Sequence, residues 1–188
     1  SSNGFASADA DITVTDNDVP TLSVTVSPSS LSENGGSATG TVSRNTTDVS
    51  SELVVNLSSG DNGEASVPAT VTIDVGESSR TFPVTGVDDL IVDGTQAVTI
   101  TAAATDFVPG SSLPVEVTDD DVATLSVSIA DDSLLESDGR STVTLSRNTA
   151  DLSSELLVSL TSSAEDELRV PASVPIPEGQ VSVAFEVF

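Results

Sequence analysis

The chain lacks histidine, cysteine, tryptophan, tyrosine, methionine and lysine, and all five of its basic residues are arginine. Nucleophilic and general-base catalysis near neutral pH usually uses His, Cys or Lys, so most enzyme classes are excluded. Hydrolysis by paired carboxylates is the one enzymatic class that this composition leaves open. Zinc and other soft metals lose their preferred thiolate and imidazole ligands, whereas hard cations that bind oxygen remain compatible with the chain.

Positive charge is also scarce, because 30 acidic residues give a formal net charge of −25. Such a chain is repelled by phosphate backbones and anionic membranes, which excludes nucleic acid as a partner and direct contact with a membrane. The sequence has neither a signal peptide nor an apolar run long enough to span a bilayer. Because it begins at Ser1 without methionine, we interpret it as a fragment whose targeting signals lie elsewhere.

The sequence that is present repeats itself. TLSVTVSPSSLSENGG from Thr21 returns as TLSVSIADDSLLESDG from Thr124, 103 positions later, and SRNTTDVSSEL returns as SRNTADLSSEL. VTDNDVPTLSV around Asp16 also mirrors VTDDDVATLSV around Asp119, which indicates the tail of a third copy. A fixed period of this kind is typical of a tandem array of one unit. We therefore expect the terminal strand of a preceding repeat at 1–18, a complete repeat at 19–121 and an incomplete repeat at 122–188.

Short alternating segments predict an all-β fold. Apolar residues alternate with Ser and Thr in six places: Leu22 to Val26, Leu53 to Leu57, Val71 to Ile73, Phe82 to Val84, Val98 to Ile100 and Leu113 to Val117. This period of two indicates half-buried strands, and Gly, Pro, Asn and Asp between them predict turns. About seven strands in about 100 residues are typical of an immunoglobulin-like Greek-key β-sandwich. We expect tandem sandwiches of this type, with Phe82 and Phe185 in their cores and ion pairs joining Arg44 to Glu52 and Arg147 to Glu155.

Acidic residues gather where the loops of the complete repeat are expected. Three groups stand out: Glu33; Asp88, Asp89 and Asp93; and Asp119, Asp120 and Asp121. Calcium binds six to eight oxygens at about 2.3–2.6 Å, mostly from loop carboxylates. If the fold brings the three loops to one end, these seven side chains can serve one ion or a cluster of ions. An all-carboxylate site favours calcium over magnesium, although spacing alone leaves both open.

The LSENGG glutamate, the VDD…DG loop, the VTDDD segment and the length of the repeat together resemble the Calx-beta domain. The resemblance covers the whole chain, and the tandem form found in long bacterial surface proteins is the nearest type. It implies a two-sheet sandwich with calcium at one apex, bound by Glu33, by Asp88, Asp89 and Asp93, and by Asp119 to Asp121. Gln96 stands where the exchanger-type loop has a further Glu, and Gly63 stands at a middle-loop Asp, with Asp61 or Glu64 as nearby substitutes.

The flanking copies carry only parts of this pattern. The second copy offers Glu136 and Asp166, and the first offers Asp16, Asn17 and Asp18, so we expect no full site in either. One further hypothesis is that residues before Asp18 of one molecule pair with an open sheet edge in the second copy of another.

The favoured function is a calcium-binding module of an extracellular or cell-surface adhesion protein, of a bacterium, in which calcium rigidifies the loops and the junction to the neighbouring repeat. The Asp119 triplet leads into the next copy almost without a linker, which favours this interpretation. The alternatives are a metal-free mechanical spacer, a calcium sensor that regulates a transporter and, more remotely, a carboxylate hydrolase; we expect that the protein is not an enzyme. The TDNDVP segment is similar to the calcium linker of cadherin repeats, but their other acidic motifs are missing.

Overall fold

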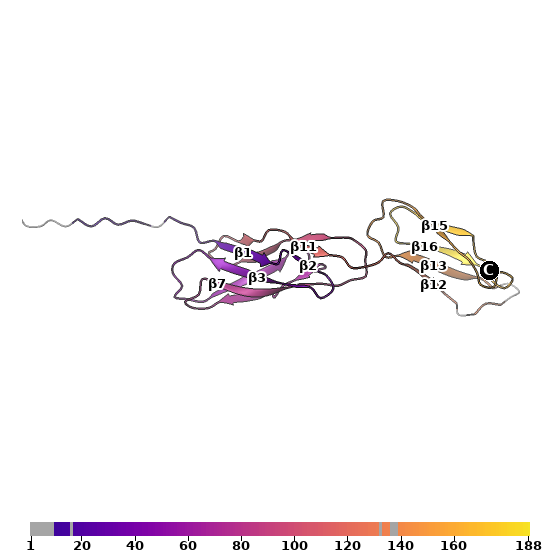
Figure 1. Ribbon diagram of the computed structural model, residues 1–188, viewed down its shortest axis with the longest axis horizontal. Helices are drawn as coiled ribbons and strands as arrows, with labels where there is room; N and C mark the ends of the chain where they lie inside the picture. Colours follow the sequence, from indigo (N-terminus) through magenta and orange to yellow (C-terminus); the bar gives the residue numbers. More distant parts are fainter. Residues whose placement is uncertain (1–9, 16, 132, 136–138) are drawn as a thin grey trace, which may run out of the picture.

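The computed structural model describes residues 10–15, 17–131, 133–135 and 139–188. All regular elements in this part of the chain are β-strands, β1 to β16, so the expected all-β fold is confirmed. The strands form two sandwiches that follow one another along the long axis (Figure 1). No helix among the described residues is long and apolar enough to cross a membrane.

The first sandwich has two layers. One sheet has the order β1-β3-β7-β5, with all neighbours antiparallel: β1 (Leu22–Ser27), β3 (Ser37–Arg44), β7 (Ser79–Gly86) and β5 (Ala65–Ser66). A second sheet has the order β10-β9-β4-β6: β10 (Gly110–Ser111), β9 (Ile100–Ala103), β4 (Leu53–Ser59) and β6 (Thr70–Ile73). A third has the order β2-β11-β8: β2 (Ser30–Ser32), β11 (Val115–Thr118) and β8 (Gln96–Val98). Since β8 and β9 are separated by Thr99 alone, the last two sheets continue one another.

Small aliphatic side chains fill most of the space between the layers. The buried cluster runs from Leu22 to Val117, and Val42, Val55, Ile73, Val84 and Ile100 are completely buried. Phe82 is the one aromatic side chain in the buried cluster, and it lies opposite Gly40 in the β3–β7 ladder. A Cβ at Gly40 would overlap the Phe82 ring, so the core accommodates this large ring because β3 has no side chain there.

Two details of the predicted strands were wrong. Leu113 lies outside β11 and its side chain is 84% exposed, because the strand begins only at Val115. The six alternating segments also omitted β3, which forms the centre of its sheet between β1 and β7.

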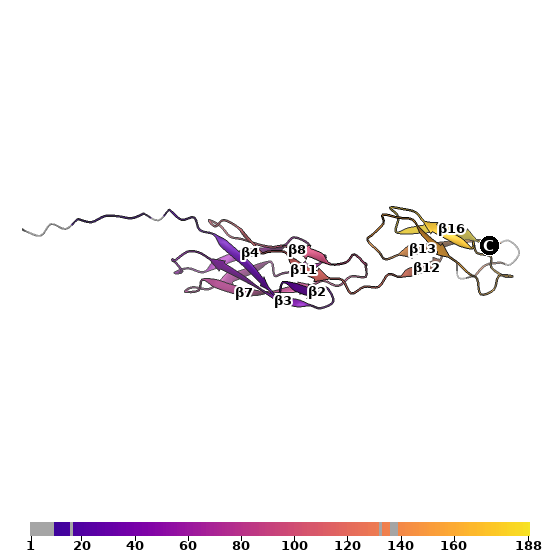
Figure 2. The same ribbon diagram turned by 45° about the horizontal axis from the view of Figure 1, so that its top comes forward.

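The second copy forms a smaller set of strands that match β1, β3, β7, β4 and β6 in position. These are β12 (Leu125–Ile129), β13 (Ser141–Arg147), β16 (Ser182–Val187), β14 (Leu156–Ser159) and β15 (Ser173–Ile176). Their core is correspondingly small, with Leu145, Val158 and Ile176 at its centre and Phe185 packed against it. Both views show these strands beyond β11, in the part of the chain that leads to the C-terminus (Figure 2).

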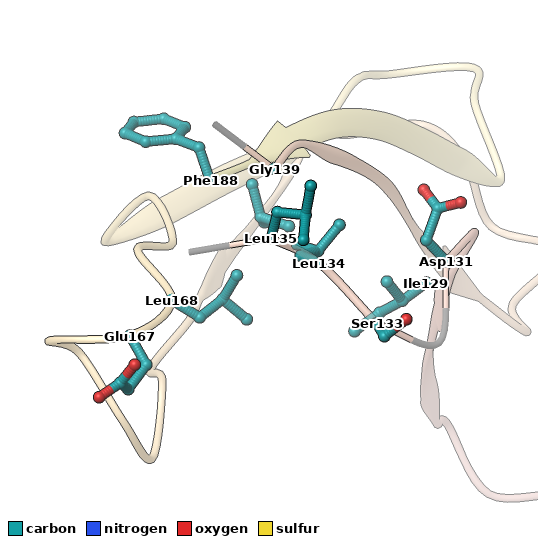
Figure 3. A pocket seen from close by; sticks show the side chains of 10 residues that line it. Ile129, Asp131, Ser133, Leu134, Leu135, Gly139, Glu167, Leu168 and Phe188 are labelled. Carbon is teal, nitrogen blue, oxygen red and sulfur yellow. The ribbon is translucent and has the colours of Figure 1, made fainter. Parts of the chain in front are cut away.

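The strand β12 has a different environment from its counterpart β1. Leu125 and Val127 are 48% and 57% exposed, whereas Leu22 and Val24 are each 5% exposed. In the first sandwich β1 packs against β9 and β10, whereas the described residues of the second copy contain no strand that corresponds to either of them. A pocket lined by Leu134, Leu135, Leu168 and Phe188, among others, lies at the end of β12, where Ile129 also lines it (Figure 3).

The two arginines of the SRNT segments do not form the predicted ion pairs. The Arg44 guanidinium donates hydrogen bonds to the carbonyl oxygens of Ser51 at 3.1 Å and Glu77 at 2.6 Å. Arg147 does the same with Ser154 at 3.2 Å and Gln180 at 2.9 Å. The predicted pairs with Glu52 and Glu155 are therefore wrong, because each buried guanidinium uses its N–H donors in four hydrogen bonds to turn carbonyls. The ion pairs in the described residues join Arg80 to Asp74 and Arg140 to Glu186.

Candidate metal centre at the junction of the two copies

Glu33 is fixed by the pairing of two strands that are far apart in the sequence. The strand β2 runs parallel to β11, and the Glu33 amide donates to the Thr118 carbonyl at 3.1 Å, which carries Glu33 to the start of the Asp119 triplet. Gly86, at the end of β7, packs so closely on the backbone of Ser32 and Glu33 that a Cβ there would overlap it. The Glu33 side chain is consequently 2% exposed, although it is an acidic residue.

Asp119 connects the closing triplet to the acidic loop after β7. Its Oδ2 atom accepts hydrogen bonds from the Asp93 amide at 2.9 Å and the Gly94 amide at 2.7 Å. Its Oδ1 atom accepts the Asp121 amide at 2.7 Å. These backbone hydrogen bonds, led by that from Gly94, lower the pKa of the Asp119 carboxyl group because they stabilise its charged form. Asp119 therefore anchors the loop through its charged carboxylate.

Carboxylate oxygens from all three loops converge at this end of the first sandwich. One oxygen each of Glu33, Asp119 and Asp121 lie within 4.8 Å of one another, and so do oxygens of Glu33, Asp88 and Asp120. The Asp120 amide also donates to Glu33 Oε1 at 3.3 Å. Five of the seven predicted site residues thus lie in two overlapping groups that share Glu33.

The other two predicted residues lie beside these groups. Asp89 Oδ1 accepts the Ile91 amide at 2.6 Å and shapes the loop, while its charge raises the pKa of both Glu33 and Asp121. Asp93 is half-buried, and its Oδ1 atom has no hydrogen-bond partner among the described residues. Asp121 Oδ2 is in the same situation. Buried carboxylate oxygens without a donor are costly unless a cation or water satisfies them, so their presence fits a cation site.

Burial and mutual repulsion determine the electrostatics of the cluster. Desolvation by burial is the largest cause that raises the pKa of Glu33, and repulsion by Asp119, Asp121 and Asp89 adds to it. The pKa of Asp121 is raised in the same way, first by desolvation and then by the neighbouring aspartates. Both shifts mean that the charged cluster is unfavourable without a positive partner.

Three further residues belong to the site. Glu64 is buried, and burial together with Asp93, Asp61, Glu33 and Asp89 raises its pKa to about 7. The sequence placed Glu64 only as a substitute for the missing middle-loop aspartate at Gly63, and no pattern in the sequence indicates that it is buried.

Asn34 and Gln96 contribute amide groups. Asn34 Nδ2 donates to Asp120 Oδ2 at 2.8 Å, and Gln96 Nε2 donates to the Asp93 carbonyl at 3.0 Å. Gln96 therefore binds the backbone of the acidic loop through its side-chain amide. The resemblance to the Calx-beta domain implies a Glu ligand at this position. The position of Asn34 directly after Glu33 is the signal that could have identified it.

The residues of the partial sites predicted in the flanking copies lie only partly within the described residues. Asp16 and Glu136 lie outside the described residues, and Asp166 is exposed. Both three-carboxylate clusters found among the described residues consist of residues from Glu33 to Asp121.

The loop that carries Asp88, Asp89 and Asp93 also contacts the second copy. The Val92 amide donates to the Asn148 carbonyl at 2.8 Å, and the Ala150 amide donates to the Val92 carbonyl at 3.0 Å. Asn148 Nδ2 additionally donates to the Leu90 carbonyl at 2.8 Å. One loop is thus hydrogen-bonded on one side to Asp119 and on the other side to the following copy.

These features define a β-sandwich module with a carboxylate cluster at the end that adjoins the next copy. The sequence model of the Calx-beta domain matches residues 15–121 and 118–167, and the chain belongs to this family. Among curated proteins, no sequence matches the chain significantly.

Solved structures similar to this one include two domains called CBD12 and a chaperone. CBD12 from CALX1.2 is 14% identical, with 88% of this chain and 75% of that chain covered and a TM-score of 0.40. The calcium binding domain CBD12 of CALX1.1 is 15% identical, with 88% and 74% covered and a TM-score of 0.40. The E. coli chaperone DraB is 14% identical, with 89% and 86% covered and a TM-score of 0.41.

Proposed function

We propose that this chain is a calcium-binding module of an extracellular surface or adhesion protein, in which calcium rigidifies the acidic loops and the junction between copies. The observation that carries the proposal is the double attachment of the acidic loop. Its Asp93 and Gly94 amides bind the Asp119 carboxylate, and its Val92 backbone binds Asn148 and Ala150. An ion that orders the carboxylates therefore also orders the segment on which the next copy packs.

Repulsion among the carboxylates supplies the driving force. Both ion pairs of the described residues lie elsewhere in the fold, so no arginine side chain pairs with the cluster. Without a cation, the negative charges of three loops repel one another and favour separation of the loops. A divalent cation removes this repulsion and holds the loops together.

The donor set supports calcium in particular. The residues that would hold it are Glu33, Asp88, Asp119, Asp120 and Asp121, together with the unpartnered Oδ1 atom of Asp93. All these ligand atoms are oxygens, which hard cations prefer, and calcium accepts several carboxylates in a flexible arrangement more readily than magnesium does. Membership of the Calx-beta family supports the same assignment.

A thermal-unfolding experiment with and without calcium tests the proposal. We expect a dissociation constant on the order of 0.1–1 mM, which is the range of extracellular calcium modules. At about 10 mM calcium, linkage then stabilises the folded chain by roughly 1.4–2.7 kcal/mol over the protein in chelator. An unchanged melting temperature, together with no heat in a calorimetric titration, would instead indicate a metal-free spacer.

Asp121→Asn is the sharpest variant for this test. The Asp121 Oδ2 atom has no hydrogen-bond partner among the described residues, so an amide at this position removes a negative charge and one of the two carboxylate oxygens at little cost to the remaining structure. We expect the calcium-dependent stabilisation to fall or disappear. Glu116→Gln is the matched control, because Glu116 is an exposed carboxylate of the neighbouring strand β11 and should leave the calcium effect unchanged.

The location outside the cell can be tested through the calcium affinity. A weak site is filled only where calcium is abundant, as it is at the surface of cells, including those of bacteria. The same calorimetric titration tests this part of the proposal. A dissociation constant below about 1 µM, in the range of cytosolic sensors and buffers, would contradict it.

A further inference from the structure

The second copy binds the acidic loop through a small surface centred on Asn148. Asn148 Oδ1 accepts the Thr124 amide at 2.7 Å, and its Nδ2 donates to the Val122 carbonyl at 3.1 Å and the Leu90 carbonyl at 2.8 Å. The Asn148 carbonyl and the Ala150 amide bind the two backbone groups of Val92, which forms a parallel bridge with Thr149. The side chain therefore orders its own turn and holds the loop of the copy before it.

The first copy has the same surface 103 positions earlier. Asn45 Oδ1 accepts the Thr21 amide at 2.7 Å, and Asn45 Nδ2 donates to the Val19 carbonyl at 3.1 Å. The turn that follows also has the same hydrogen bonds. Thr46 Oγ1 donates to the Asp48 carbonyl as Thr149 Oγ1 donates to the Asp151 carbonyl. The Ser50 amide donates to Asp48 Oδ1 at 3.0 Å, as the Ser153 amide does to Asp151 Oδ1 at 3.0 Å.

In this first surface, the backbone groups of Asn45 and Thr47 that correspond to the loop-binding groups of Asn148 and Ala150 bind no loop in the described part of the chain. Asn45 is exposed, whereas Asn148 is half-buried. Among the described residues, neither the Asn45 carbonyl nor the Thr47 amide makes a hydrogen bond, although their counterparts bind Val92. A pocket of about 240 Å³ lies between residues 18–20 and 45–48. Pro20 and Thr47 replace Ala123 and Ala150, and these changes leave the backbone groups of Asn45 and Thr47 in place.

We propose that the surface formed by residues 18–20 and 45–48 is a docking site for the loop corresponding to 90–92 of another copy of this module, placed before it. The occupant is specified by its backbone groups. One of its residues must offer a carbonyl to Asn45 Nδ2. The residue two positions later must donate its amide to the Asn45 carbonyl and accept the Thr47 amide with its own carbonyl. The 90–92 loop offers this set to Asn148 and Ala150. Among the described residues, no loop offers this set to Asn45 and Thr47. The contact goes beyond the proposed calcium role, because it consists of hydrogen bonds that need no ion.

The test uses an extended chain in which a further copy of residues 19–121 replaces residues 1–18 ahead of the present sequence. This added copy contains the whole buried cluster of the first sandwich. Amide hydrogen exchange of Thr47 is measured by NMR in the extended and in the 188-residue chain. We expect exchange at Thr47 to slow by about three- to tenfold in the extended chain, the factor that one net hydrogen bond supplies. Ala150 should be protected in both chains, and it reports that the junction is folded.

Asn45→Asp removes the side-chain donor of the docking site. It also removes the local hydrogen bond to the Val19 carbonyl, but it does so in both chains, so the comparison between the two chains reports docking. The carboxylate still accepts the Thr21 amide through Oδ1 but has no donor for a loop carbonyl. In this variant, we expect Thr47 to exchange at the same rate in the two chains. If Thr47 of the unmodified extended chain exchanges as fast as in the 188-residue chain while Ala150 stays protected, the docking site does not exist. Protection of Thr47 that persists undiminished in Asn45→Asp would equally overturn the assignment to Asn45.

Discussion

At the scale of single residues, Glu64 and Asp119 have opposite electrostatic environments within one cluster. Asp119 accepts three backbone amides, which lower its pKa and keep it charged. Glu64 is buried among other acidic residues, and its pKa is raised to about 7. Asp119 is therefore an anchor at all physiological pH values. Glu64 changes its protonation state near neutrality, so it makes the calcium-free module sensitive to pH.

The stability of the calcium-free chain should increase as the pH falls from about 7 towards 4.5. Glu64 has a pKa of about 7 in the folded protein against 4.5 for an ordinary solvated glutamate, so between these values the folded state binds more protons than the unfolded state. The raised pKa values of Glu33 and Asp121 have the same sign, and the lowered pKa of Asp119 opposes them. Urea unfolding in chelator at about pH 5.5 and 7.5 measures the effect.

Glu64→Gln should flatten this pH profile, because the amide is neutral at both pH values. The variant is expected to be more stable than the unmodified chain in chelator at about pH 7.5 and nearly equal to it at about pH 5.5. Glu116→Gln, which changes an exposed carboxylate, should retain the original profile. A Glu64→Gln profile that is as steep as that of the unmodified chain would assign the pH effect to other groups.

At the scale of elements, strands were predictable where large apolar residues alternate, as in β1, β4 and β7. The strand β3 was missed because its inward positions are Ala38, Gly40 and Val42, which include two small residues. The strands β2, β5 and β10 contain two or three residues and are too short for a period of two to be visible. Their existence depends on pairing with strands far away in the sequence.

The acidic loops were predictable for a related reason, since carboxylates in turns are visible in the sequence. The convergence of Glu33 with Asp119 depends on the parallel pairing of β2 with β11, which joins segments 86 residues apart at Ser30 and Glu116. The burial of Glu64 depends on the packing of the sandwich, and the contact of Asn148 with Leu90 depends on the placement of two copies. Neither has a local signal, and both were missed.

Gly40→Ala should destabilise the first sandwich by roughly 1–3 kcal/mol, the usual cost of overpacking a core. The added Cβ would overlap the Phe82 ring, which is 3% exposed and surrounded by other core residues. Thr39→Ala is the matched control on the exposed face of β3 and should change the stability by less than about 0.5 kcal/mol. Chemical denaturation measures both variants. Equal stability of the two would show that Phe82 moves without cost.

At the scale of the whole molecule, an asparagine stands at the corresponding position of each copy, and one of the two lies at the junction between the copies. Asn45 and Asn148 make the same two hydrogen bonds within their own copies, to Thr21 and Val19 or to Thr124 and Val122. Only Asn148 adds a hydrogen bond across the junction of the described chain, to Leu90. Mutation of either residue should therefore have the same effect within its own copy. Only mutation of Asn148 should also affect the contact between the two copies.

Asn148→Ala should loosen the junction in the 188-residue chain, whereas Asn45→Ala should not. Both variants lose the same two side-chain hydrogen bonds within their own copy and neither adds a charge, so they are expected to lose similar local stability. NMR relaxation of backbone amides should show the two sandwiches of Asn148→Ala tumbling more independently than those of Asn45→Ala. Calcium should increase the coupling of the two sandwiches in Asn45→Ala and do so less in Asn148→Ala, because the ordered 88–94 loop then lacks one of its contacts with the next copy. Identical tumbling of the two variants, with and without calcium, would mean that the acidic loop does not transmit order from the carboxylate cluster to the following copy.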